Sequence, residues 1–152
     1  MPIPLAELAL DLTKEYPRSP RALFAGYVIV GRVLDKCRAI LNGTGGEYLY
    51  DCGLDRIFLE FTAISAEDFR DFVATGATDE EVAEWIQDKA IRHSPAEIAA
   101  WNFGLKGRRI CEMPPDRQAW VQEYLLANVP PEAQERVVFN FDLVDAEEGR
   151  LG

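Results

Sequence analysis

The sequence SPRALFAGYVIVGRVLDKCRAIL, residues 19–41, carries the strongest helix signal in the chain. Ser19 is a good N-cap, and Pro20 fits the first helical position, where no backbone N–H is needed. Apolar residues then recur at spacings of four and three, as on one face of an α-helix: Leu23, Tyr27, Val30, Leu34, Cys37 and Leu41. The pattern predicts one continuous, central and buried helix from about residue 20 to about residue 41, which Asn42 and Gly43 end.

Capping patterns predict further helices after this one. Thr78 and Glu81 form a complete capping box, and comparable starts occur near residues 65, 94 and 114. Residues 54–62 also have a helical pattern. We place one tryptophan on the inner face of each of three of these helices: Trp85, Trp101 and Trp120.

Two short segments alternate in the manner of strands. Residues 137–144 place Phe139, Phe141 and Leu143 on one side, and residues 47–52 alternate enough to pair with them. Either segment could instead be irregular. We expect a mainly α fold: a compact bundle of five or six helices in a single domain over residues 1–152, with or without a small two-stranded β-ribbon.

Length and charge limit the classes of function. The 152 residues are 48% hydrophobic, which is enough for one buried core. Sixteen basic and 26 acidic residues give a net charge of −10, which argues against nucleic acid and against anionic membrane surfaces as partners. No apolar run is long enough to span a membrane.

The three cysteines are an odd number and are widely spaced, so we expect free thiols and a reducing cytoplasmic location. Cys37 lies on the apolar stripe and is expected in the core, between Lys36 and Arg38. Cys52 lies in a loop and is the cysteine expected to be more exposed.

Neither a cofactor nor a metal ion is assigned from the sequence. The glycine-rich segment 43–46 follows a helix, whereas a phosphate-binding loop precedes one, so we expect it to reverse the chain. Glu47, Asp51 and Asp55 recur every four residues and could hold Mg²⁺ or Ca²⁺ through their oxygens. A solvated acidic edge is the alternative.

The loop at residues 43–55 is where a small-molecule site is expected, if the chain has one. Its glycines let the backbone approach a ligand closely, and its tyrosines can stack and donate hydrogen bonds. The candidate ligand-binding residues are Glu47, Tyr48, Tyr50 and Asp51 in the loop, and Asp35, Lys36 and Arg38 in the preceding helix. The alternative is that Glu47 pairs with Lys36 or Arg38 and that the tyrosines cover the edge of the core.

Several stretches together resemble a known family: 11–20 (DLTKEYPRSP), 34–41 (LDKCRAIL), 46–52 (GEYLYDC) and 145–150 (DAEEGR). They are similar to bacterial proteins of the domain of unknown function 5069 family, and the similarity covers nearly the whole chain. The resemblance implies a small, stand-alone bacterial cytoplasmic protein and supplies no activity. Gly53 stands where the family has proline, which concerns only the local turn.

Two classes of function remain open. The first is a non-enzymatic binding or scaffold protein that acts through a protein partner or as a homodimer. It is favoured because no nucleophile–base pair, metal cluster or cofactor loop is recognisable. The second is a small-molecule-binding protein or an enzyme with its site at the 43–55 loop. No catalytic residue is assigned.

Overall fold

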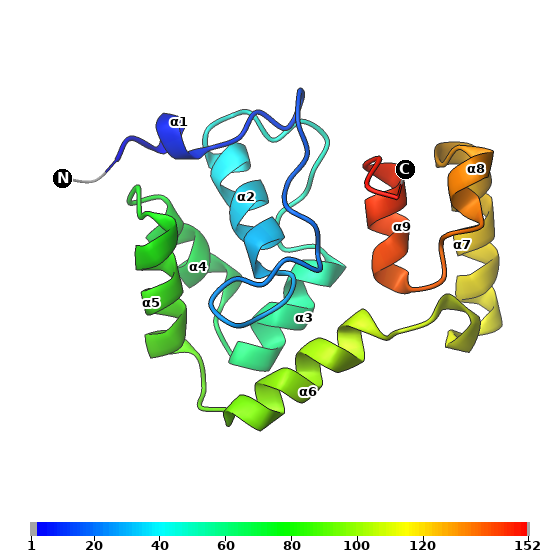
Figure 1. The fold of residues 1–152 in the computed structure, drawn as a ribbon. Helices are drawn as coiled ribbons and strands as arrows, with labels where there is room; N and C mark the ends of the chain where they lie inside the picture. The colour runs from blue at the N-terminus through cyan, green and yellow to red at the C-terminus, as the bar shows by residue number, and fades with distance from the viewer. Residues whose placement is uncertain (1–2, 152) are drawn as a thin grey trace. The chain divides into compact units, whose positions relative to one another are not determined.

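The computed structural model describes residues 3–151, and this part of the chain is helical and contains no strand (Figure 1). Its residues group into two compact units, the first ending at Ser94 and the second beginning at Pro95. The single domain expected over residues 1–152 stays a prediction. None of the helices between residues 3 and 151 is long and apolar enough to cross a membrane.

The first unit is built around a central helix, α2, which packs against α3 and α4. Its helices are α1 (Leu5–Leu8), α2 (Val30–Leu41), α3 (Gly53–Thr62), α4 (Ala66–Val73) and α5 (Asp79–Lys89). The expected capping box is present at the start of α5. The backbone N–H of Glu81 donates to Thr78 Oγ1 at 3.3 Å, and that of Thr78 donates to Glu81 Oε1 at 3.1 Å.

Aromatic side chains fill the core of the first unit. The Phe58 and Phe69 rings are fully buried and meet edge to face with 6.2 Å between their centroids. Tyr27 meets Phe58 in the same way at 5.7 Å, and Trp85 contacts Phe69 at 6.1 Å. Edge-to-face packing places positive ring edges against negative ring faces, so these contacts add to the free energy gained by burial.

The prediction of one helix over residues 20–41 is wrong in its first half, because α2 begins at Val30. Phe24 and Tyr27 instead exchange two backbone hydrogen bonds of 2.9 Å across a tight turn. The turn residues Ala25 and Gly26 have φ values of 53° and 90°. Positive φ values at both central positions are typical of a hairpin turn and incompatible with a right-handed helix.

The apolar stripe is therefore divided between the turn and the helix. Leu23 is 64% exposed, against the prediction. The other predicted members Tyr27, Val30 and Leu34 are buried, and Leu41 is half-buried. Ile29, with a φ of 77°, forms the junction immediately before α2.

The second unit contains α6 (Pro95–Lys106), the 3₁₀-helix η1 (Ile110–Glu112), α7 (Pro115–Asn128), α8 (Pro131–Gln134) and α9 (Asn140–Glu147). α7 contacts η1 and α8. One hydrophobic cluster of this unit is small: Val129, Ala133 and Ala146 are buried, with Leu125, Val137 and Leu151 packed against them. Phe141 and Val121 are buried as well. Trp120, predicted on an inner face, is 45% exposed and stacks on Tyr124 at 5.1 Å.

The predicted strand over residues 137–144 is wrong, because α9 begins within it at Asn140. Asp142 Oδ2 accepts the backbone N–H groups of Val138 at 2.9 Å and Phe139 at 2.8 Å. This side chain satisfies donors at the start of the helix, which a period-two pattern does not reveal. Residues 47–52 do not form a strand either. The β-ribbon and the count of five or six helices are thus not supported, since residues 3–151 contain nine α-helices.

Replacing Leu34 by alanine tests the burial of α2. Leu34 is fully buried, so the cavity left by Leu34→Ala should lower the free energy of unfolding by about 2–5 kcal/mol. Leu23→Ala removes the same atoms from an exposed site and should change it by about 0.5 kcal/mol or less. Urea denaturation measures both values, and equal losses would contradict the corrected start of α2.

Candidate functional site

The loop between α2 and α3 is tied to α2 by the ammonium of Lys36, a side chain that is 4% exposed. Lys36 Nζ donates to the carbonyl oxygen of Leu49 at 3.0 Å and to Cys52 Sγ at 3.2 Å. It also lies 2.8 Å from Asp55 Oδ1. The bonds to Leu49 and Cys52 use two of the three N–H donors of the ammonium. Asp55 Oδ1 accepts no hydrogen bond from the described residues, and it pairs with the ammonium by charge. Lys36 is thus engaged in holding the loop.

The Asp55 carboxylate contacts the Lys36 ammonium through Oδ1 and the start of α3 through Oδ2. Its Oδ2 accepts the backbone N–H of Cys52 at 3.4 Å, at the start of α3. Asp51 pairs instead with Arg56 at 3.2 Å, and Glu47 is exposed. Asp55 and Asp51 therefore have different partners, and Glu47 is in neither pair. Between residues 3 and 151, no group of three or more His, Cys, Asp or Glu side chains is arranged to hold a metal ion.

Asp35 and Arg38 of α2 also bind within the first unit. Asp35 accepts three hydrogen bonds from Arg18, from the backbone N–H at 2.9 Å, from Nε at 3.0 Å and from Nη2 at 2.9 Å. Arg38 Nη1 lies 2.7 Å from Asp79 Oδ1, and its Nη2 donates to the Ala77 carbonyl at 2.9 Å. These bonds join α2 to the preceding segment and to the first residue of α5.

The two tyrosines of the loop are held by neighbouring groups. The Tyr50 hydroxyl donates to the Ala66 carbonyl at 2.7 Å, and its ring stacks on Phe69 at 6.3 Å. Burial raises the pKa of Tyr50 above its ordinary value. The Tyr48 ring faces the guanidinium of Arg32 at 5.5 Å. The expected alternative, tyrosines at the edge of the core, describes Tyr50, whereas Lys36 and Arg38 bind Asp55 and Asp79 in place of Glu47.

Cys52 combines exposure with positive surroundings. It is half-buried, occupies the N-cap of α3, and has the Lys36 ammonium at 3.2 Å. An ammonium and a helix N-terminus are surroundings in which nucleophilic thiols occur in proteins. The other two differ: Cys37 is buried, and burial raises its pKa to about 12, whereas Cys111 is exposed. The sequence identified Cys52 as the more exposed of the loop and core thiols but not its contact with Lys36.

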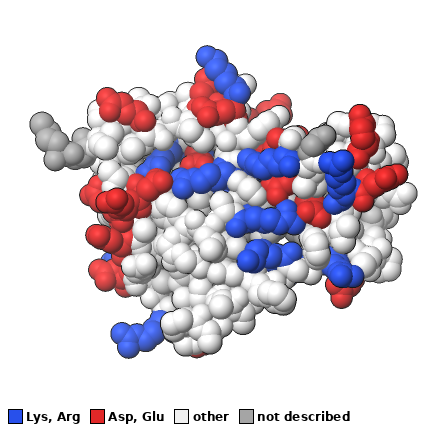
Figure 2. Space-filling model, in the orientation of Figure 1, with Lys and Arg blue, Asp and Glu red and all other residues white. Residues whose placement is uncertain are grey.

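A second surface, which the sequence analysis missed, lies on α6. Only Glu97 and Lys106 are charged among its 12 residues, and Figure 2 shows few charged side chains over this helix, in contrast to the acidic α5. Phe103 is 77% exposed. Its exposed neighbours on the same face, at helical spacing, are small: Ala96, Ala99 and Ala100. Helices that are apolar all round usually bury more than one face. The scarcity of charge in residues 95–105 was the available signal.

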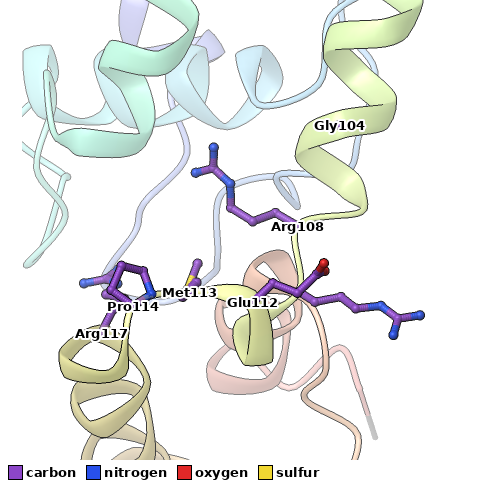
Figure 3. A pocket seen from close by; sticks show the side chains of 7 residues that line it. Gly104, Arg108, Glu112, Met113, Pro114 and Arg117 are labelled. Carbon is purple, nitrogen blue, oxygen red and sulfur yellow. The ribbon is translucent and has the colours of Figure 1, made fainter.

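A pocket of about 530 Å³ lies after the C-terminal end of α6. Seven residues line it: Gly104, Arg108, Arg109, Glu112, Met113, Pro114 and Arg117. Figure 3 shows the Met113 side chain between Arg108 on one side and Pro114 with Arg117 on the other. Three arginines within ten residues of an acidic chain were the signal for this pocket.

Comparison with known proteins gives a family match. The family model described as "Domain of unknown function (DUF5069)" matches residues 14–150. The matched range includes Lys36 with its partners in the loop, the exposed face of α6, and the pocket at the end of α6. No curated protein matches the chain.

Replacing Lys36 by methionine tests the tie between α2 and the loop. Lys36→Met leaves the Asp55 carboxylate buried without its ammonium and should lower the free energy of unfolding by about 3–5 kcal/mol. The double variant Lys36→Met/Asp55→Asn removes both charges and keeps a side-chain oxygen for the Cys52 N–H, so it should recover part of this loss. As a control, Arg56→Ala breaks an exposed pair and should cost about 1 kcal/mol at most. Denaturant titration measures all three, and a Lys36→Met loss no larger than that of the control would refute the tie.

Proposed function

The chain belongs to the family described as domain of unknown function DUF5069, and we propose that it is a non-enzymatic binding protein that associates with a second copy through the exposed face of α6. The observation that carries this proposal is Phe103, a large apolar side chain that is 77% exposed on a helix with only two charged residues. Interface centres are enriched in aromatic residues and depleted of charge.

The absence of charge on this face favours a second copy as the occupant. Two chains of net charge −10 repel each other, and they approach best where neither presents a charge. A twofold dimer uses the same patch on both copies. With two antiparallel α6 helices, each Phe103 would pack over the small side chains Ala96, Ala99 and Ala100 of the other copy.

We place this function in the cytoplasm. The three cysteines are free, which suits a reducing compartment. The resemblance of the chain to bacterial proteins supports a bacterial origin within the same proposal.

Phe103→Ser tests the association. Loss of a central aromatic side chain should weaken dimerisation on the order of 10- to 100-fold, as measured by sedimentation equilibrium over a range of concentrations. The matched control is Leu49→Ser, which removes a 71% exposed apolar side chain from the first unit and should leave the dimer unchanged. A wild-type chain that stays monomeric throughout, or equal weakening by both variants, would overturn the proposal.

The second candidate function is a small-molecule site at the 43–55 loop, and the Cys52 thiol is the specific observation that favours it. The predicted residues Asp35, Lys36 and Arg38 bind protein groups. The proposal therefore rests on the partly exposed side of the loop: Glu47, Tyr48, Tyr50, Asp51 and Cys52. There, the Cys52 sulfur, with the Lys36 ammonium 3.2 Å away, would add to a small molecule that carries an activated carbon–carbon double bond, and the thiol proton would pass to the neighbouring carbon.

Relative thiol reactivity tests this second candidate within the wild-type chain. Cys52 should react with iodoacetamide at pH 7.5 faster than Cys111, although Cys111 is the more exposed thiol. Cys37 should react only after unfolding, because it is buried and its pKa of about 12 keeps it protonated. Peptide mass spectrometry gives the three rates, and denaturation without reductant should expose all three thiols. Faster labelling of Cys111 than of Cys52 would rule out an activated thiol.

A further inference from the structure

The pocket after α6 gathers positive charge in an acidic chain. Three of its seven lining residues are arginines and one is a glutamate, so its lining has a formal charge of +2, whereas the chain carries −10. Within residues 3–151, none of the three guanidinium groups forms an ion pair with a carboxylate. Arg108, Arg109 and Arg117 thus line the pocket with guanidinium groups that no carboxylate neutralises.

Two of these arginines are positioned by aromatic rings. The Arg109 guanidinium lies over the Phe139 ring at 5.9 Å, and that of Arg117 lies over Trp120 at 4.4 Å. A guanidinium that stacks through its face leaves its N–H edge for a bidentate contact with an oxyanion. Positioning before binding reduces the conformational entropy that a ligand must remove.

The backbone around Arg108 and Arg109 is also fixed. Asn140 N–H donates to the Arg108 carbonyl at 2.8 Å, and Ile110 N–H donates to the Val138 carbonyl at 3.0 Å. These two bonds join the turn after α6 to the segment before α9. The arginines therefore extend from a braced segment, which suits a preformed site.

The N-terminal end of α7 adds to the positive field. Pro114 and Arg117 line the pocket, and Pro114 is the N-cap of this 14-residue helix. The positive end of the helix dipole is therefore close to the pocket, where it favours an anion.

The remaining lining defines the rest of the ligand. Met113 and Pro114 offer apolar contacts, and Figure 3 shows Met113 between Arg108 and Arg117. The volume of about 530 Å³ is within the range of small-molecule sites. The Glu112 carboxylate repels negative charge, so we expect a ligand whose negative charge is confined to one end.

We propose that this pocket binds a small organic anion, with a phosphate or carboxylate group held by guanidinium groups of the lining and an apolar body against Met113. The site uses different side chains from the association face of α6, so it does not depend on the proposed dimer.

Isothermal titration calorimetry at fixed ionic strength tests the proposal, with phenyl phosphate and benzoate as probes. We expect one probe molecule to bind per chain. Phenyl phosphate as the tighter probe would identify a phosphate ligand, and benzoate as the tighter probe would identify a carboxylate ligand. Inorganic phosphate should bind at least tenfold more weakly than phenyl phosphate, because it lacks the apolar body.

Charge-neutral variants separate a specific site from general attraction. Arg108→Gln and Arg117→Gln should each weaken the better probe at least tenfold. Lys106→Gln removes a nearby exposed positive charge that does not line the pocket, and it should change affinity less than twofold. Circular dichroism confirms that each variant is folded. The proposal is overturned if neither probe binds, if inorganic phosphate binds as tightly as phenyl phosphate, or if Lys106→Gln weakens binding as much as the arginine variants.

Discussion

The buried ammonium of Lys36 is the contact on which the first unit depends. It joins α2 to the Leu49 carbonyl, the Cys52 sulfur and the Asp55 carboxylate at distances between 2.8 and 3.2 Å. A buried charge is costly unless an opposite charge and hydrogen bonds compensate it, and here the Asp55 carboxylate and two acceptors from one short stretch of chain do so. The loop and the start of α3 are consequently placed by α2. The same contact leaves the half-exposed sulfur of Cys52 beside a positive charge.

The two units use their apolar residues differently. The first unit encloses aromatic rings such as Phe58 and Phe69, and its buried Lys36 and Asp55 form an ion pair. The second unit buries Phe141 and a small cluster around Val129 and Ala133, and it exposes Phe103. Both association and anion binding are therefore proposed for the second unit, where apolar surface and guanidinium groups remain accessible.

Local signals in the sequence identified much of the fold, and interactions between distant residues account for most of the rest. The capping box of Thr78 and Glu81 acts within one turn and was read correctly. The start of α2 was missed because Tyr27, which is buried in the preceding turn, continues the apolar spacing of the helix that begins at Val30. Ala25–Gly26 was the overlooked turn signal. The strand predicted near Phe139 failed because the side chain of Asp142 caps a helix there.

The sequence also predicted only part of the candidate site, because the rest depends on contacts between distant residues. The sequence placed Lys36 and the loop together, but it could not show that Asp55, 19 positions further on, takes up the ammonium. The sequence offered Lys36 or Arg38 as a partner of Glu47 only as the alternative to ligand binding, and these two cations bind Asp55 and Asp79. Arg108 and Arg117 were not connected because they line the same pocket only in the folded unit.

Ile29 combines a φ of 77° with a fully buried side chain. A β-branched residue in the left-handed region costs about 1–3 kcal/mol, and such strain persists only where the surroundings enforce it. The enforcing contacts exist only once the core around α2 has assembled. We therefore expect the segment over residues 20–29 to become ordered late in folding, after α2 has met α3 and α4. For the same reason, this segment should open in native-state hydrogen exchange before α2, α3 and α4.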